Sequence, residues 1–226
     1  KRKQIITGMR RSGKYVPMIL KMLREEGMPL DLVYMVPAES NFNVIIRSHK
    51  SAVGLWQFIA STGRNYGLKI NRWIDERRDP VLSTKAAITY LKHLYGLFGD
   101  WELAMAAYNT GEGRVKRAIK KAKRKGLKHN YSSLRLPRET RNYVPSIMAM
   151  AVIYKNPARY GLGHVRPIEA MDETKSSLPV SFSLEEVAQR SKMSFRMLRE
   201  KNQALFLGVP PMKQKRYSFY IPQRFH

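Results

Sequence analysis

Apolar residues recur at helical spacing along most of the first 160 residues. From residue 5 to residue 26 they fall three or four positions apart, and Gly27 with Pro29 ends the pattern. Proline at a first helical position favours a second helix that begins at Pro29. The same spacing predicts further helices over residues 80–98, 101–108, 115–125 and 137–154.

The pattern changes near Gly161-Leu162-Gly163, where glycine, proline and serine become frequent, and we expect a linker over 161–178. Beyond it, the order strand, helix, helix, strand is predicted over 180–182, 184–190, 195–202 and 217–221. Ser183 and Glu186 form a capping-box pattern at the first of these helices. The fold class is therefore mainly α, with one helical domain over 1–164 and a linker with a small α+β module over 165–226.

The amino-acid composition excludes several kinds of active site and of protein. The 226 residues include no cysteine, which excludes a disulfide framework, a thiol nucleophile and a cysteine zinc site. Hydrophobic residues make up 43% of the chain, which is ordinary for a globular protein. No run reaches the about 20 apolar residues of a membrane helix. The chain opens at Lys1 rather than Met, so we treat it as a processed or trimmed piece.

Charge points to anionic partners. The formal net charge is +25, with 31 basic and 11 acidic residues in 1–164 and 11 basic and 6 acidic residues in 165–226. Such a surface favours nucleic acid, an anionic membrane or an acidic cell-wall polymer. The chain has no zinc-finger spacing, no RNA-recognition motif and no basic region joined to heptads, so no specific nucleic-acid partner is expected.

Glu39 is the first candidate for chemistry. It continues the apolar stripe of Leu32, Met35 and Val36, at the C-terminal end of the helix from Pro29. Burial and the negative end of the helix dipole would both raise the pKa of this carboxyl, as a general acid near neutral pH requires. The alternative is that Glu39 lies past the helix end and is solvated.

Four motifs follow one another in a fixed order, with an Asp75–Pro80 segment between the second and third. They are Glu39-Ser40-Asn41-Phe42, Gly54-Leu55-Trp56-Gln57-Phe58 with Ser48 before it, Ala107-Tyr108-Asn109-Thr110-Gly111, and Glu139-Thr140-Arg141-Asn142-Tyr143. Over about residues 15–160, this order resembles the goose-lysozyme-like lytic transglycosylases of glycoside hydrolase family 23, most closely the membrane-bound lytic transglycosylase D type.

The resemblance implies an enzyme that cleaves the β-1,4 bond between N-acetylmuramic acid and N-acetylglucosamine in peptidoglycan. Its single acid, matched by Glu39, protonates the glycosidic oxygen and then takes the proton of the muramic C6 hydroxyl, which closes a 1,6-anhydro ring. Most glycosidases need a second carboxylate as nucleophile or as base for water, whereas here the internal hydroxyl replaces water, so one carboxylate is enough. A lysozyme-type hydrolase of the same bond, acting on ordinary or modified glycan, stays open, as does a glycan or polyanion binder without catalysis.

The resemblance also implies substrate-binding residues. Ser48 matches a serine that bonds the catalytic carboxyl or the substrate, and Gln57 matches a glutamine of the sugar groove. Tyr108 and Asn109 match a pair that faces the acetamido side, and Tyr143 matches a tyrosine close to the acid. No cofactor is implied.

Several neighbours have plainer interpretations. Trp56 and Phe58 are expected to pack in the core rather than stack on a sugar, and Glu139 to form an ion pair. His49 has no partner at metal-ligand spacing, so no metal site is expected. Lys50 stands where the family has small residues, so one edge of the groove should gain a charge.

Two features outside the motifs remain. The run 114–128 contains nine basic residues and no acid, so it is either a solvated face or a surface for anionic wall or membrane. Residues 179–226 resemble a LysM-like segment, which implies binding of glycans that contain N-acetylglucosamine; a docking module without glycan affinity is the alternative. We expect a monomer, exported to the periplasm or cell envelope.

Overall fold

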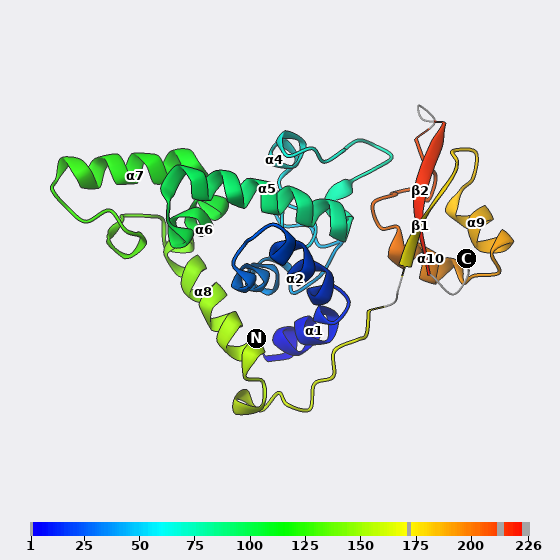
Figure 1. The fold of residues 1–226 in the computed structure, drawn as a ribbon, viewed down its shortest axis with the longest axis horizontal. Helices are drawn as coiled ribbons and strands as arrows, with labels where there is room; N and C mark the ends of the chain where they lie inside the picture. Colours follow the sequence, from blue (N-terminus) through cyan, green and yellow to red (C-terminus); the bar gives the residue numbers. More distant parts are fainter. Residues whose placement is uncertain (1, 171–172, 212–214, 223–226) are drawn as a thin grey trace.

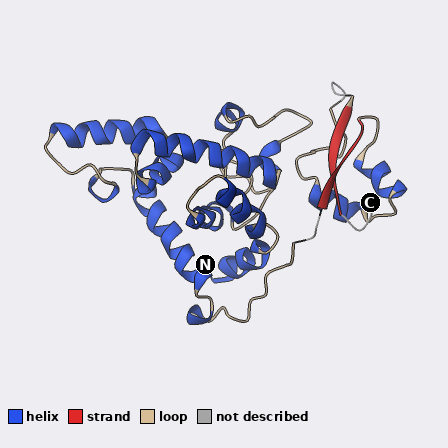
Figure 2. Ribbon diagram, in the orientation of Figure 1, coloured by secondary structure: helices blue, strands red, loops and turns tan. Residues whose placement is uncertain are grey.

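The computed structural model describes residues 2–170, 173–211 and 215–222; within the predicted C-terminal region, 171–172, 212–214 and 223–226 lie outside the described residues. Helices dominate the first 160 residues, and a small two-stranded sheet with two helices lies at the other end of the molecule (Figures 1 and 2). The mainly α fold with a small α+β part is confirmed. No helix in the described part of the chain combines the length and apolar character needed to cross a membrane.

The helical domain contains eight α-helices among its described residues. These are α1 (Arg2–Ser12), α2 (Val16–Glu25), α3 (Met35–Ser40), α4 (Ala60–Asn65), α5 (Pro80–Phe98), α6 (Trp101–Thr110), α7 (Glu112–Arg124) and α8 (Arg138–Lys155). Short 3₁₀ helices η1 (Leu30–Tyr34), η2 (Glu76–Arg78), η3 (Tyr131–Ser133) and η4 (Ala158–Tyr160) lie between them.

The single helix predicted over 5–26 is wrong, because the chain breaks between α1 and α2. At Gly13 an added Cβ atom would lie 2.3 Å from the carbonyl oxygen of Ile168. The backbone N–H of Ile168 also donates to the carbonyl of Arg10 at 2.7 Å. The segment that follows the helical domain therefore crosses the chain where only glycine leaves room, and local periodicity carries no sign of that contact.

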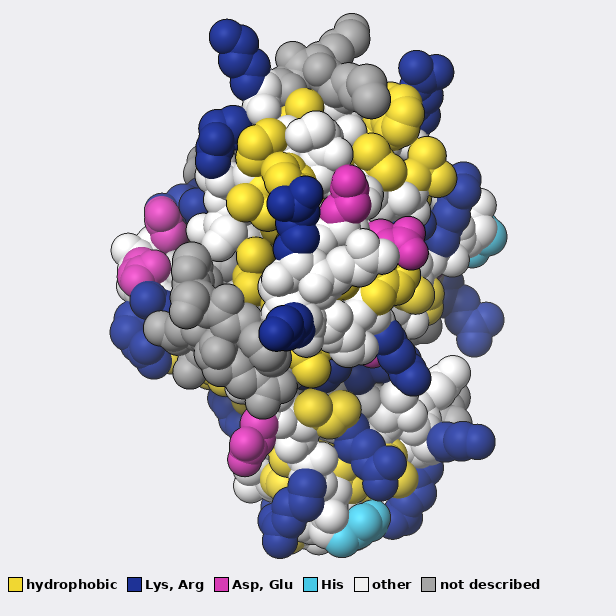
Figure 3. Space-filling view, turned by 90° about the vertical axis from the view of Figure 1, so that its right-hand side faces the viewer, with side chains coloured by type: hydrophobic (Ala, Val, Ile, Leu, Met, Phe, Trp, Pro, Cys, Tyr) yellow, Lys and Arg dark blue, Asp and Glu magenta, His cyan; other side chains and the backbone are white. Residues whose placement is uncertain are grey.

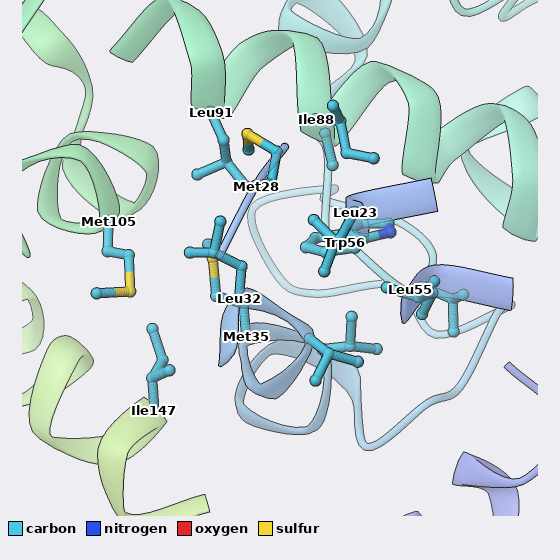
Figure 4. Packing of buried hydrophobic residues seen from close by; sticks show 14 of the residues in the cluster. Leu23, Met28, Leu32, Met35, Leu55, Trp56, Ile88, Leu91, Met105 and Ile147 are labelled. Atoms are coloured by element: carbon cyan, nitrogen blue, oxygen red, sulfur yellow. The ribbon is translucent and has the colours of Figure 1, made fainter. Parts of the chain in front are cut away.

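The core forms where α2, η1, α3 and α5 meet the loop before α4. Trp56 is fully buried there and donates its indole N–H to the Thr84 hydroxyl at 2.9 Å. Figure 4 shows apolar side chains from these segments around Trp56, among them Leu23, Leu32, Met35, Ile88 and Leu91. The expectation that Trp56 packs in the core is confirmed.

Side-chain caps fix the long helix and its neighbour. The Asp79 carboxylate accepts from the backbone N–H groups of Val81 and Leu82 at the start of α5, and Gly99 ends the helix in a left-handed conformation with φ 63°. Asp100 then caps α6. Three alanines of α6 are fully buried, which allows close packing of this helix against its neighbours; they are Ala104, Ala106 and Ala107.

The tail module, which we define as residues 173–222, has the predicted strand, helix, helix, strand order. Strand β1 (Glu173–Pro179) pairs antiparallel with β2 (Arg216–Pro222), and helices α9 (Leu184–Arg190) and α10 (Phe195–Lys201) lie between them in sequence. The Ser183–Glu186 capping box is present. The strand predicted over 180–182 is wrong, since β1 ends at Pro179, and the linker is correspondingly shorter.

Basic residues are spread over the surface rather than gathered in one patch on the face that Figure 3 shows. Lys and Arg side chains are scattered there among neutral and hydrophobic ones, with few acidic side chains between them. A denser run lies on α7, where Val115 and Ala122 are buried and the lysines and arginines lie on the outer faces. The basic side chains of α7 are therefore exposed, on a helix that packs through its apolar side, and both alternatives for this run stay open.

Candidate active site

Glu39 lies in the last turn of α3, the helix that packs against α8. Leu32, Met35 and Val36 precede it and are buried, as the sequence pattern predicted. The single helix predicted from Pro29 is wrong, because its first part is the 3₁₀ helix η1 and only its second part is α3. Directly after the helix, Asn41 takes a left-handed conformation with φ 49° and turns the chain away. The alternative in which Glu39 lies past the helix end is wrong, and its side chain is partly buried.

The environment of Glu39 makes it a weak acid. Burial raises the pKa of this carboxyl from its ordinary value of 4.5 to about 7. A hydrogen bond donated by the Tyr143 hydroxyl to Oε1 opposes the rise in pKa, and the nearby negative charge of Glu139 adds to it. A carboxyl with a pKa near 7 is protonated in a substantial fraction of molecules at neutral pH, which a general acid requires.

Glu39 opens onto a cleft of about 340 Å³, a size typical of small-molecule sites. The wall combines hydroxyl, amide, aromatic and charged side chains, which suits a polar ring-shaped ligand such as a sugar. Besides Glu39, the lining residues used below are Lys50, Gln57, Tyr90, Tyr108, Asn109 and Glu139.

Hydrogen bonds from neighbouring side chains to backbone carbonyls hold the cleft loop, which we define as residues 51–58. The Tyr108 hydroxyl donates to the Trp56 carbonyl at 2.7 Å, and the Ser40 hydroxyl beside Glu39 donates to the Leu55 carbonyl at 2.9 Å. Neighbours that satisfy backbone carbonyls in this way restrict the loop to one shape. The loop therefore presents Ala52, Gln57 and Phe58 to the cleft in a preorganised arrangement.

Gln57 occupies the strained position of this loop. Its φ of 49° lies in the left-handed region, which a non-glycine residue adopts at a cost of about 1 kcal/mol or more. Its side-chain amide donates to the carbonyls of Gly54 at 2.9 Å and Ile46 at 3.3 Å. The amide nitrogen is thus anchored, and the side chain lines the cleft.

Four of the five predicted substrate-binding residues meet around Glu39 or its cleft. Gln57, Tyr108 and Asn109 line the cleft, and Tyr143 bonds the acid itself. Ser48 is placed differently, because its hydroxyl accepts the backbone N–H of Ala52 at 3.1 Å within a turn. In the part of the chain that the structure describes, Ser48 forms no hydrogen bond to Glu39 and does not line the cleft.

Burial and buried neighbours fix the hydrogen-bonding roles of Asn109, Tyr108 and Tyr143. Thr140 is 1% exposed and donates its hydroxyl to the amide oxygen of Asn109 at 2.9 Å. This bond fixes the amide so that its nitrogen is the end left for a ligand. Burial also raises the pKa values of the Tyr108 and Tyr143 hydroxyls well above the ordinary value, so both remain donors at physiological pH.

An ion pair and a further tyrosine also belong to the cleft. Lys50 and Glu139 form an ion pair of 3.1 Å at its edge, which confirms Glu139 as an ion-pair partner and Lys50 as an added charge. Tyr90 of α5 lines the cleft and lies against Tyr108, with ring centroids 5.2 Å apart. Sequence reasoning missed Tyr90 because it lies beside the apolar stripe of α5 and belongs to none of the four motifs.

Among the described residues, no group of three or more histidine, aspartate or glutamate side chains is arranged to hold a metal ion. The site has the partly buried Glu39 with hydrogen-bonding side chains around it, and the ion-paired Glu139 at its edge. Such an arrangement suits proton transfer to and from a bound polar ligand.

Comparison with known proteins shows which family the chain resembles in sequence. Residues 17–131 match the family model described as the transglycosylase SLT domain. Over 153 residues the chain is 46% identical to the membrane-bound lytic murein transglycosylase D of Escherichia coli (strain K12), covering 67% of this chain and 34% of that protein. It is 28% identical over 183 residues to the peptidoglycan transglycosylase gp16 of Escherichia phage T7, covering 80% of this chain and 13% of that protein.

Solved structures share the fold. The 70 kDa soluble lytic transglycosylase of Escherichia coli superposes with a TM-score of 0.52 at 24% identity, over 66% of this chain and 25% of that one. The chain thus spans about a third of the length of its Escherichia coli relative and a quarter of the superposed structure. The family match extends over half of the chain and contains Glu39 and most of the cleft, so the chain belongs to the transglycosylase SLT domain family.

Proposed function

We propose that this protein is a peptidoglycan lytic transglycosylase that cleaves the β-1,4 bond between N-acetylmuramic acid and N-acetylglucosamine. The observation that carries the proposal is a single partly buried carboxyl, Glu39, with a pKa of about 7, bonded by Tyr143 in an open cleft. The names of the Escherichia coli and phage relatives, which specify murein and peptidoglycan, supply the substrate class.

The first step is protonation of the leaving group. Neutral Glu39 donates its proton to the glycosidic oxygen as the bond to the muramic C1 atom breaks and positive charge develops at C1. The Glu39 carboxylate that remains then accepts the proton of the muramic C6 hydroxyl while the C6 oxygen bonds to C1. Glu39 is thereby protonated again, one end of the cut strand is a 1,6-anhydro ring, and no water is consumed.

The neighbours of Glu39 suit these two steps. The Tyr143 hydroxyl remains a donor throughout, so it stabilises the carboxylate formed after the first transfer and holds its orientation. Gln57 and Asn109 each have one end of the amide anchored inside the protein, which leaves the other end directed for recognition of sugar hydroxyl or acetamido groups.

Hydrolysis is the second candidate, and Glu139 is the observation that favours it. Its carboxylate lines the same cleft and influences the pKa of Glu39, so a base for water is close to the acid. Against this role, Glu139 is engaged by Lys50 at 3.1 Å. We propose that this ion pair keeps Glu139 from activating water, so that the internal hydroxyl is the nucleophile.

Digestion of purified sacculi tests the function. Wild-type protein should release soluble muropeptides, and Glu39→Gln should release none while retaining the fold. Glu139→Gln serves as the matched control because it removes the other carboxylate of the cleft and should leave cleavage intact. Undiminished release by Glu39→Gln would overturn the assignment of the acid.

The proposal also covers the cellular location of the protein and its contacts outside the cleft. A peptidoglycan substrate places the protein in the periplasm or cell envelope, and the basic face of α7 adds electrostatic contact with anionic wall or membrane. We also propose that the LysM-like tail module contacts glycan strands and that the protein acts as a monomer. Binding of the full chain to sacculi at rising salt measures the electrostatic part.

A further inference from the structure

The segment 73–79 lies between the tail module and the cleft loop. On the tail side, the backbone N–H of Asp75 donates to the Ala204 carbonyl at 2.9 Å, and the N–H of Phe206 donates to the Trp73 carbonyl at 3.0 Å. These two bonds flank an isolated antiparallel β-bridge between Ile74 and Leu205. Backbone hydrogen bonds thus join the helical domain to the tail module.

Side-chain packing reinforces this junction. Ile74 is 2% exposed and belongs to the same hydrophobic cluster as Leu198, Leu205 and Phe219 of the tail module. The helical domain thus contributes a side chain to the core of the tail module. Removal of this apolar side chain from water stabilises the contact between the two parts.

On the cleft side, Arg77 makes the connection. Its guanidinium donates through Nε and Nη2 to the two carboxylate oxygens of Asp75, each at 2.8 Å. Its Nη1 donates to the carbonyls of Ser51 and Phe58, both at 3.0 Å. Arg77 is only 7% exposed, so these are buried, charge-assisted bonds of the stronger kind.

The two carbonyls belong to the first and last residues of the cleft loop. Holding both ends fixes the loop between them, including the left-handed backbone of Ser51 (φ 59°) and Gln57 (φ 49°). Strained conformations of this type persist only where surrounding structure over-determines them. Asp75 thereby links two sets of bonds, one to the tail module through its backbone and one to the cleft loop through Arg77.

We propose that Arg77 is a positioning residue for substrate binding and that docking of the tail module on segment 73–79 holds it in place. The tail module then contributes to the shape of the cleft whether or not it contacts glycan itself. The consequence for substrate binding rests on the function proposed above, whereas the mechanical link between tail and loop does not.

Amide hydrogen exchange on the full chain tests the link directly. The amides of Val53, Gly54 and Gln57 are hydrogen-bonded within or next to the cleft loop and report its opening. Arg77→Lys keeps the charge but loses the guanidinium fork, and we expect these amides to exchange about tenfold faster. Arg64→Lys is the matched control, because Arg64 donates to the Ile70 carbonyl nearby but does not reach the loop.

A second variant tests the link from the tail side with Arg77 intact. Ile74→Ala removes the side chain that enters the tail core, and we expect the same three amides to exchange faster, by about threefold or more. Unchanged exchange of these amides in both Arg77→Lys and Ile74→Ala, with melting of the tail as the only effect, would overturn the proposal.

Kinetics on sacculi distinguish positioning from general damage. Because Gln57 moves while Glu39 keeps its bond from Tyr143, Arg77→Lys should raise KM about tenfold and leave the pH midpoint of kcat unchanged. A fall in kcat with a shifted midpoint and unchanged KM would contradict the positioning role. If wild-type protein cleaves no sacculi, the proposed function fails, and the exchange experiment still decides the link between tail and loop.

Discussion

The Tyr143 hydroxyl donates a hydrogen bond to Oε1 of Glu39 across 104 positions of the sequence. The two residues belong to α8 and α3, which pack against each other. The orientation of the Glu39 carboxyl therefore depends on the packing of α3 against α8 and not on α3 alone. Through this bond, Tyr143 of α8 also lowers the pKa of Glu39.

Removal of this hydroxyl should weaken the enzyme and shift its pH dependence. The Tyr143 bond lowers the pKa of Glu39, so Tyr143→Phe should move the alkaline limb of the rate profile to higher pH. Loss of an oriented donor to the carboxylate should also reduce kcat by about tenfold or more. Tyr160→Phe, at an exposed tyrosine in η4, is the control and should change neither quantity. An unshifted pH profile in Tyr143→Phe would contradict the role of this bond.

The raised pKa of Glu39 has a consequence for stability. Because the folded-state pKa of about 7 exceeds the ordinary value of 4.5, the folded protein holds this proton more tightly than the unfolded chain does. The free energy of unfolding should therefore fall as pH rises from about 4.5 to about 7. Glu39→Gln removes the buried charge and should stabilise the protein by about 2 kcal/mol at pH 8, with little effect at pH 4. Equal effects at both pH values in urea denaturation would contradict the assigned ionisation.

The ion pair at the cleft edge should tune the acid. Lys50→Met leaves the negative charge of Glu139 uncompensated, which should raise the pKa of Glu39 further and shift the alkaline limb of activity upward. Because both partners are well exposed, we expect a small shift, below about one pH unit. Lys92→Met removes a comparable exposed partner of Glu26 away from the cleft and should leave the profile unchanged. The double variant Lys50→Met with Glu139→Gln should reverse the shift, and a shift that persists would exclude Glu139 as its source.

Gly54 should be intolerant of a side chain. Its φ is 88°, and an added Cβ atom would lie 1.9 Å from the Arg77 carbonyl oxygen. Gly54→Ala should therefore destabilise the protein by about 3 kcal/mol or more, from strain and from displacement of the backbone that carries Arg77. Gly67→Ala has a similar φ of 86° with no atom within 4 Å of the added Cβ, so it measures the strain alone. Equal losses in the two variants would show that close approach is not the reason for glycine at position 54.

Helices, caps and the acid follow from local signals in the sequence. The stripe of Leu32, Met35 and Val36 predicts where Glu39 lies, and Ser183 with Glu186 predicts the start of α9. These features depend on residues three or four positions apart, which a sequence displays directly. Their outcome in the structure is accordingly close to the expectation.

Contacts between segments that lie far apart in the sequence could not be predicted from such local patterns. The break at Gly13 depends on Ile168, and the fixing of the cleft loop depends on Arg77 and the tail module. The hydroxyl of Ser48 stays within its own turn, although its motif suggested a contact with the acid or the substrate. A motif places a residue near the site, whereas the direction of its side chain is set by packing that periodicity does not encode.

The most direct measurement is the mass of the soluble muropeptides that the full chain releases from purified sacculi. We expect products that end in 1,6-anhydro muramic acid, each lighter by one water than the corresponding hydrolysis product, because the C6 hydroxyl replaces water at C1. Glu139→Gln should give the same anhydro products, and Glu39→Gln should give none. Reducing ends alone, or reducing ends that disappear in Glu139→Gln, would contradict a single-carboxylate transglycosylase and identify a lysozyme-type hydrolase.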